Sequence, residues 1–113
     1  MSISPAERDA EAVRHMIAAG DNILRFAKGG KKRFLEDLMV QSAIERQFEI
    51  LGEAAARASA GFHDAHPEIP WRSLVAFRNV IIHGYDGLDP ERIWNALGTP
   101  LKEALEALRR SQA

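Results

Sequence analysis

The residues of this chain best suited to chemistry gather in one short stretch. Arg78, Asn79 and His83 stand there among apolar residues and are followed by Tyr85, the only tyrosine of the chain. A histidine exchanges protons near neutral pH, an arginine holds a phosphate or carboxylate in a planar fork, and an asparagine amide orients either one. A guanidinium that is desolvated without an anionic partner is very costly. Arg78 therefore predicts an internal carboxylate partner or a site for an anionic ligand.

A helical register of about 100° per residue places these groups on two faces of one predicted helix. Asn79 and His83 are four residues apart and share one face. Arg78 and Tyr85 lie along the centre of a broad apolar stripe on another face. The stripe is formed by Leu74, Val75, Phe77, Ile81 and Ile82. An arginine in that position must be paired or must face a groove.

Each of these side chains also has a structural interpretation. Glu45 and Glu49 lie within or beside the apolar face of an upstream helix, so either carboxylate could form an internal ion pair with Arg78 that fixes the helix register. A histidine near a helix C-terminus, such as His83, is a favourable partner of the helix dipole. Tyr85 alone would be a half-buried packing residue with its hydroxyl at the surface. The residues by themselves leave both interpretations open.

Two other polar clusters carry weaker predictions. His63 and His66 are three residues apart in a proline-containing segment with no evident third ligand, so no metal site is predicted. The basic run from Lys28 to Arg33 lacks the residue order of a triphosphate-binding loop, which argues against a nucleotide hydrolase. The run predicts a solvated turn, or else a rim that attracts an RNA backbone or an acidic partner.

The elements that must position these groups all have helical patterns. Ser4 is expected to cap a first helix that has Pro5 in its first turn and ends at Gly29-Gly30. The apolar periodicity predicts a second, long helix from about Phe34 to Ser59. The segment from Phe62 to Ile69 is expected to form a loop.

Two more helical segments follow that loop. Pro70 is expected as the first residue of the helix that carries the polar groups, and Gly84 closes it. Asp89-Pro90 repeats the cap-and-proline start of the first helix. Because proline disrupts a helix interior, Gly98-Thr99-Pro100 predicts either a kink or two consecutive helices, with Thr99 capping the second.

These patterns predict an all-α domain that spans residues 1–113. We expect an antiparallel up-and-down bundle of four or five helices, with Trp71 and Trp94 as packing anchors. Phe77 and the run from Val80 to Ile82 make the helix that carries Arg78 apolar on nearly every side. The core of a single bundle cannot cover all of these apolar side chains. An excess of this kind is typical of an interface, so a homodimer is predicted.

Length and composition restrict the protein class. The chain has 113 residues, a formal net charge of -1 and no cysteine. The charge argues against a protein that coats nucleic acid nonspecifically, and the lack of cysteine excludes disulfides and thiolate chemistry. No basic segment followed by an apolar run opens the chain, and no stretch reaches membrane-spanning length. We expect a soluble cytoplasmic domain without membrane association.

The polar stretch resembles a known family. The segment from Arg78 to His83 is similar to the arginine, four to six residues, histidine signature of the HEPN superfamily, and His83-Gly84-Tyr85 resembles its extended form in HepT-like toxins. Flanking segments are similar to the same family, so the resemblance covers nearly the whole chain. They are Glu49 to Ala54, Ile69 to Arg72 and Leu88 to Trp94.

The resemblance implies a HEPN-like helical domain that acts as a metal-independent endoribonuclease toxin without a cofactor. In that reading His83 is the general acid or base, Arg78 clamps the scissile phosphate, and Asn79 positions the substrate or the imidazole. It also implies a homodimer, because the family motifs lie in a cleft at a two-fold interface. Two facing copies would supply two histidines and two arginines.

The HepT-like resemblance further implies a protein partner. In that family a nucleotidyltransferase of the MNT type is the antitoxin of a type VII-like pair, and it transfers AMP to the tyrosine two residues after the histidine, here Tyr85. A bulky anionic adenylate beside His83 would fill the cleft and repel RNA phosphates. The alternative is a non-catalytic helical module that binds a nucleotide or the nucleotidyltransferase.

Overall fold

The computed structural model describes residues 3–84 and 88–112, and all regular secondary structure in them is helical. The predicted all-α class is confirmed. The elements are α1 (Pro5–Phe26), the 3₁₀ turn η1 (Ala27–Gly29), α2 (Gly30–Glu36), α3 (Leu38–Arg57), α4 (Ala60–Ala65), α5 (Trp71–Ile82), α6 (Pro90–Ala96) and α7 (Thr99–Ser111).

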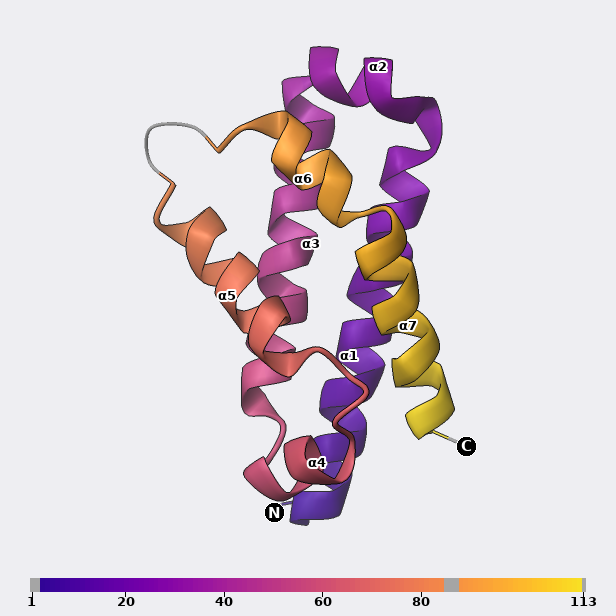
Figure 1. Ribbon diagram of the computed structural model, residues 1–113, viewed down its shortest axis with the longest axis vertical. Helices are drawn as coiled ribbons and strands as arrows, with labels where there is room; N and C mark the ends of the chain where they lie inside the picture. The colour runs from indigo at the N-terminus through magenta and orange to yellow at the C-terminus, as the bar shows by residue number, and fades with distance from the viewer. Residues whose placement is uncertain (1–2, 85–87, 113) are drawn as a thin grey trace.

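Four longer helices, α1, α3, α5 and α7, alternate in direction and form the up-and-down bundle (Figure 1). α1 packs along α3, α3 packs along α5, and α7 lies against α1. The short helices α2 and α4 lie at opposite ends of the bundle, and α6 leads into α7 (Figure 1). This order leaves α5 at the edge of the bundle, with α3 as its principal support.

The core consists of the apolar faces of these helices. Met16 and Ile23 from α1 meet Ile44 and Leu51 from α3, and all four are fully buried. Residues three, four and seven apart supply these faces, as the periodicity predicts. The core therefore centres on the α1–α3 pair, to which α5 and α7 are added on either side.

The helices that begin with a clear capping signal start where the sequence predicts. The Ser4 hydroxyl accepts a hydrogen bond from the Glu7 N–H at 3.1 Å, and Pro5 begins α1. The Asp89 carboxylate accepts from the Glu91 N–H at 3.0 Å, and Pro90 begins α6. A side-chain acceptor at the first turn satisfies an otherwise unpaired N–H, which explains why these signals are reliable.

The bounds of the first two predicted helices differ from those observed. The first helix ends at Phe26, and the chain turns through η1 before Gly30, at φ +90°, begins α2. The long second helix begins at Leu38 because the Asp37 carboxylate accepts from the Met39 and Val40 N–H groups at 3.0 and 3.2 Å. It ends at Arg57.

The segment predicted as a loop begins inside a helix. Ser59 caps α4, and its hydroxyl accepts from the Phe62 N–H at 3.2 Å. Pro70 is the N-cap of α5, so this helix begins one residue later than predicted. Of the two alternatives for residues 98–100, two consecutive helices are observed, with Gly98 instead of Thr99 as the cap of α7.

Within the described residues, no helix combines the length and the apolar character that crossing a membrane requires.

Candidate active site

Helix α5 carries the predicted site and is buried on one side only. Of its residues, all of which are described, Trp71 alone is buried. Leu74, Val75, Phe77 and Ile81 are half-buried and pack against the core. The Phe77 ring contacts the Phe48 ring of α3 edge to face, with centroids 4.9 Å apart. The helix is therefore anchored to α3 by an aromatic contact near the polar residues.

The residue at position 52 determines how closely α5 packs against α3. Gly52 is buried, and a Cβ there would lie 2.9 Å from the Leu74 carbonyl oxygen and would collide with the Cβ of Arg78. Only a residue without a side chain lets the stem of Arg78 lie directly on α3. A glycine inside a helix costs about 1 kcal/mol relative to alanine, so its presence there was a signal of close packing that the sequence analysis missed.

Arg78 is half-buried and its guanidinium bonds to its neighbour in the chain. Nη1 donates to Oδ1 of Asn79 at 3.0 Å, whereas the buried Nε has no hydrogen-bond partner in the described part of the chain. A buried donor without a partner is rare in proteins and calls for an explanation. Nε itself is enclosed, so an anion would reach the guanidinium at its exposed Nη end.

The predicted internal ion pair of Arg78 with Glu45 or Glu49 is not formed among the described residues. Glu49 pairs instead with Arg46, whose Nη1 lies 2.9 Å from Oε2. Arg46 lies one helical turn before Glu49 on the same helix, where an ion pair requires no contact between helices. The positive charge of Arg78 is consequently not neutralised by either carboxylate.

Glu45 lies half-buried on α3. Burial raises the pKa of its carboxyl above the ordinary value, and the negative charge of Glu49 four residues later raises it further. Like charges at this spacing on a helix destabilise each other. The Glu45 carboxyl therefore takes up a proton more readily than an ordinary glutamate does.

His83 is the C-cap of α5, and its side chain is exposed. Its backbone N–H donates to the Asn79 carbonyl at 3.1 Å. Asn79 thus connects the two ends of the motif, because its side chain binds Arg78 and its carbonyl binds the backbone of His83. The structure brings these three residues together on the last turns of α5, whereas Tyr85 lies outside the described residues.

The loop histidines form a different cluster, at the junction of α4 and α5. The ring of His63 stacks on Trp71 with centroids 4.3 Å apart, and its Nε2 lies 2.9 Å from the Ala55 carbonyl oxygen. Nδ1 of His66 lies 3.2 Å from the Glu68 carboxylate. Trp71 donates its indole N–H to the His66 carbonyl at 3.0 Å. These contacts hold the start of α5 in place, and Trp71 is the packing anchor that the sequence predicts.

Part of the basic run has a structural role. Lys31 forms an ion pair with Glu91 of α6 at 2.9 Å, and Nε of Arg33 bonds to Asp37 at 3.0 Å. The first contact ties α2 to α6, and the second supports the residue that caps α3. Lys28 and Lys32 are exposed at the same end of the bundle.

The chemistry of the α5 cluster follows from these contacts. A guanidinium without a carboxylate partner attracts an oxyanion and can bind it through two parallel hydrogen bonds. An exposed imidazole lies one turn further along, and this type of side chain can serve as a general acid or base. The arrangement is suited to acid–base chemistry on a phosphate ester.

Comparisons with known proteins point to one family. A family model described as ribonuclease HepT-like matches residues 16–111. A Methanocaldococcus jannaschii protein described as a candidate RNase is 30% identical over 91 residues, which cover 79% of this chain and 84% of that protein. A Thermococcus cleftensis protein described as a candidate ribonuclease HepT is 39% identical over 80 residues, covering 68% and 73% respectively. No solved structure gives a significant match.

Proposed function

This chain belongs to the ribonuclease HepT-like family, and from this we propose that it is a metal-independent endoribonuclease, the toxin of a toxin–antitoxin pair. The observation that carries the proposal is Arg78. Its guanidinium is half-buried, its Nε lacks a hydrogen-bond partner among the described residues, and neither Glu45 nor Glu49 neutralises it. An RNA phosphate at the exposed Nη end of this side chain would neutralise its charge.

Cleavage of RNA without a metal needs one base, one acid and a phosphate clamp. The ribose 2′-oxygen bonds to the adjacent phosphorus and gives up its proton to the base, while the bond from phosphorus to the 5′-oxygen breaks and the acid protonates that oxygen. The products are a 2′,3′-cyclic phosphate and a 5′-hydroxyl. In this scheme His83 supplies proton transfer, Arg78 stabilises the nonbridging oxygens, and Asn79 holds the guanidinium in place.

One chain offers a single His83, so we propose that two copies share the cleft. Two apolar residues of α5 support this arrangement, because Val80 and Ile82 are half-buried and lie outside the core cluster. Leu38 and Met39 at the start of α3 are 75% and 81% exposed. Apolar residues left uncovered in this way are typical of an interface. A two-fold dimer would bring a second histidine to the reaction.

Purified variants test the activity. His83→Ala and Arg78→Ala should each lower the rate of RNA cleavage by a factor of about 10² to 10⁴, the usual effect of removing an acid–base group or an oxyanion donor. His66→Ala is the matched control and should cleave RNA like the wild type. Excess EDTA should not change the rate. Helicity by circular dichroism should be the same in all variants. A loss of helicity in Arg78→Ala would argue instead that Arg78 has only a structural role.

We further propose that an MNT-type nucleotidyltransferase silences the enzyme by transferring AMP to Tyr85. Because the chain contains one tyrosine, the test gives an unambiguous readout. Incubation with the partner, ATP and magnesium should add AMP to the peptide that contains Tyr85, as seen by mass spectrometry, and should stop cleavage. Tyr85→Phe should resist modification and retain activity. Modification of a serine or threonine instead would refute this mechanism of control.

A further inference from the structure

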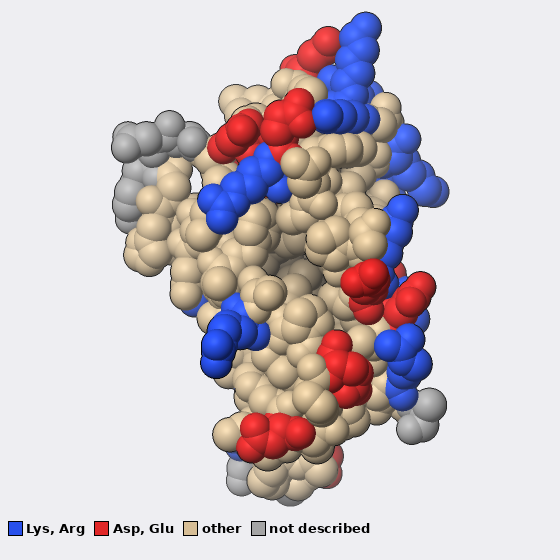
Figure 2. Space-filling view, in the orientation of Figure 1, with Lys and Arg blue, Asp and Glu red and all other residues tan. Residues whose placement is uncertain are grey.

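A groove opens between α5 and α7, and Arg78, Asn79 and His83 are not among the residues that line it. It has a volume of about 530 Å³. Its floor is apolar and comes from three helices, with Phe48 and Leu51 of α3, Leu74 and Phe77 of α5, and Leu101 of α7. Figure 2 shows this face as an uncharged surface around a central hollow, with charged groups at its margins.

The groove exists because the bundle does not close. α5 packs on α3 and α7 packs on α1, so the two outer helices flank an opening over the core (Figure 1). The wall from Pro70 to Phe77 rises about 10 Å at 1.5 Å per residue, which is roughly two helical turns. An opening of this shape, long and bordered by antiparallel helices, fits a further helix better than a compact ligand.

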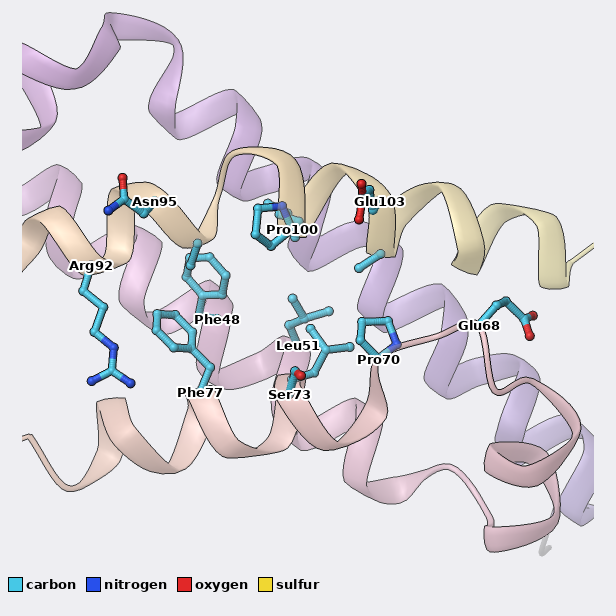
Figure 3. Close-up of a pocket in the computed structure, with 14 residues that line it drawn as sticks. Phe48, Leu51, Glu68, Pro70, Ser73, Phe77, Arg92, Asn95, Pro100 and Glu103 are labelled. Carbon is cyan, nitrogen blue, oxygen red and sulfur yellow. The ribbon is translucent and has the colours of Figure 1, made fainter.

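The two ends of the groove carry opposite charges. Arg92 and Asn95 from α6 lie at one end, and Glu68 and Glu103 lie at the other (Figure 3). The labelled apolar side chains Phe48, Phe77 and Leu51 lie between them. Sites for small molecules usually place a few polar groups around one point, whereas these groups are separated along the length of the groove.

We propose that this groove binds an amphipathic helix of a protein partner. The apolar face of that helix covers the floor, with residues spaced three and four apart. Its N-terminal turn carries lysine or arginine and lies beside Glu68 and Glu103, and its C-terminal turn carries glutamate or aspartate beside Arg92. The same orientation places the positive end of the helix dipole at the two glutamates and the negative end at Arg92.

A labelled variant measures this binding directly. Because the chain lacks cysteine, Ser73→Cys on the groove wall can be coupled to an environment-sensitive fluorophore at a single position. Two stapled helical peptides serve as probes, with the same leucine face and the same composition. One has lysines at its N-terminal end and glutamates at its C-terminal end, and the other has these charges exchanged. We expect saturable binding of the first peptide and at least about fivefold weaker binding of the second, because two end contacts become repulsive.

Two further variants make the result specific to the groove. Ala76→Cys, on the same helix but outside the groove lining, is the control position for the label. Charge reversal with Arg92→Glu and Glu103→Lys should invert the preference, so that the exchanged peptide binds more tightly. Absence of saturation by both peptides at millimolar concentration would overturn the proposal, as would equal affinity for both. Binding of a small apolar dye without either peptide would identify a small-molecule site instead. None of these measurements depends on RNA cleavage.

Discussion

Arg78 lies against α3 because position 52 carries no side chain. The residue proposed to hold the phosphate therefore depends on a glycine that touches neither substrate nor solvent. Asn79 then fixes the far end of the same side chain through Oδ1. Together the two contacts restrict the guanidinium at its stem and at its tip, which is the kind of restraint that a phosphate clamp requires.

The residue most sensitive to a small change should be Gly52. A Cβ at this position meets the backbone of Leu74 and the stem of Arg78, so Gly52→Ala must push α5 away from α3. We expect the free energy of unfolding to fall by about 1 to 3 kcal/mol, the usual cost of overpacking. Cleavage should fall by up to about 100-fold, because a displaced guanidinium no longer fits the transition state.

Urea unfolding and initial cleavage rates measure the two effects. Gly61→Ala is the matched control, since a Cβ at this exposed α4 position meets nothing within 4 Å. It should be neutral or stabilising by up to about 1 kcal/mol, through helix propensity alone. Equal behaviour of the two alanine variants would contradict the proposed contact.

Glu45 gives a prediction that depends on pH. Its pKa is raised by burial and then by the charge of Glu49, so the folded chain holds the proton more tightly than the unfolded chain. Stability is therefore lost as the pH rises above the ordinary value of 4.5 and the carboxyl ionises. Glu45→Gln should increase the free energy of unfolding at pH 7 by up to about 1 kcal/mol, a small gain because the group is partly exposed. The gain should disappear near pH 4. If Glu45→Gln increased the free energy of unfolding more at pH 4 than at pH 7, the raised pKa of Glu45 would be contradicted.

At the scale of elements, the sequence predicts the helix boundaries that are set by hydrogen bonds between residues close together in the chain. Ser4 and Asp89 each accept a hydrogen bond two or three residues away, so their caps are visible in the local sequence. The break at Asp37 was missed because the apolar periodicity continues across it from Phe34 to Val40. α4 was missed because a helix of six residues gives little periodicity.

The difference between contacts within one helix and contacts between helices also applies to the candidate site. Arg78, Asn79 and His83 are neighbours along one helix, so their motif and spacing identified them as a group. The contact of Arg78 with Gly52 depends on how closely α5 and α3 approach each other, whereas Glu49 pairs with Arg46 within α3. Neither helical periodicity nor charge patterning specifies the distance between α5 and α3, and so the sequence left open whether Arg78 pairs with a glutamate of α3.

The attachment of α4 gives a prediction for one element. Asp9 of α1 is 8% exposed, and its carboxylate accepts from the Ser59 N–H and from the Ser59 hydroxyl, both at 2.8 Å. Asp9→Ala should lower the free energy of unfolding by about 1 to 3 kcal/mol, because it removes two hydrogen bonds to a charged, buried acceptor. Asp21→Ala removes an exposed α1 carboxylate that pairs with Arg109 and should cost less than about 1 kcal/mol. Urea unfolding compares them, and equal losses would show that the tie between α1 and Ser59 is unimportant.

At the scale of the whole molecule, the side of α5 near its C-terminus carries apolar residues that lie outside the core cluster. Ile82 is half-buried there, outside the core cluster. If two copies meet on this side, Ile82→Glu should weaken the dimer at least about 100-fold, since it buries an unpaired charge. Ala76→Glu, at an exposed position of the same helix, should have little effect. Light scattering over a range of concentrations measures both, and a wild type that stays monomeric at high concentration would exclude the shared cleft.

The one-sided support of α5 has a further consequence for the local opening of the fold. A helix that rests mainly on one neighbour separates at a lower free energy than the α1–α3 pair, so its amide hydrogens should exchange with solvent before those of the core. A second copy would close the other side and slow that exchange. The element that carries Arg78 would then be most ordered when dimers form, and cleavage in dilute solution would rise with the square of the protein concentration.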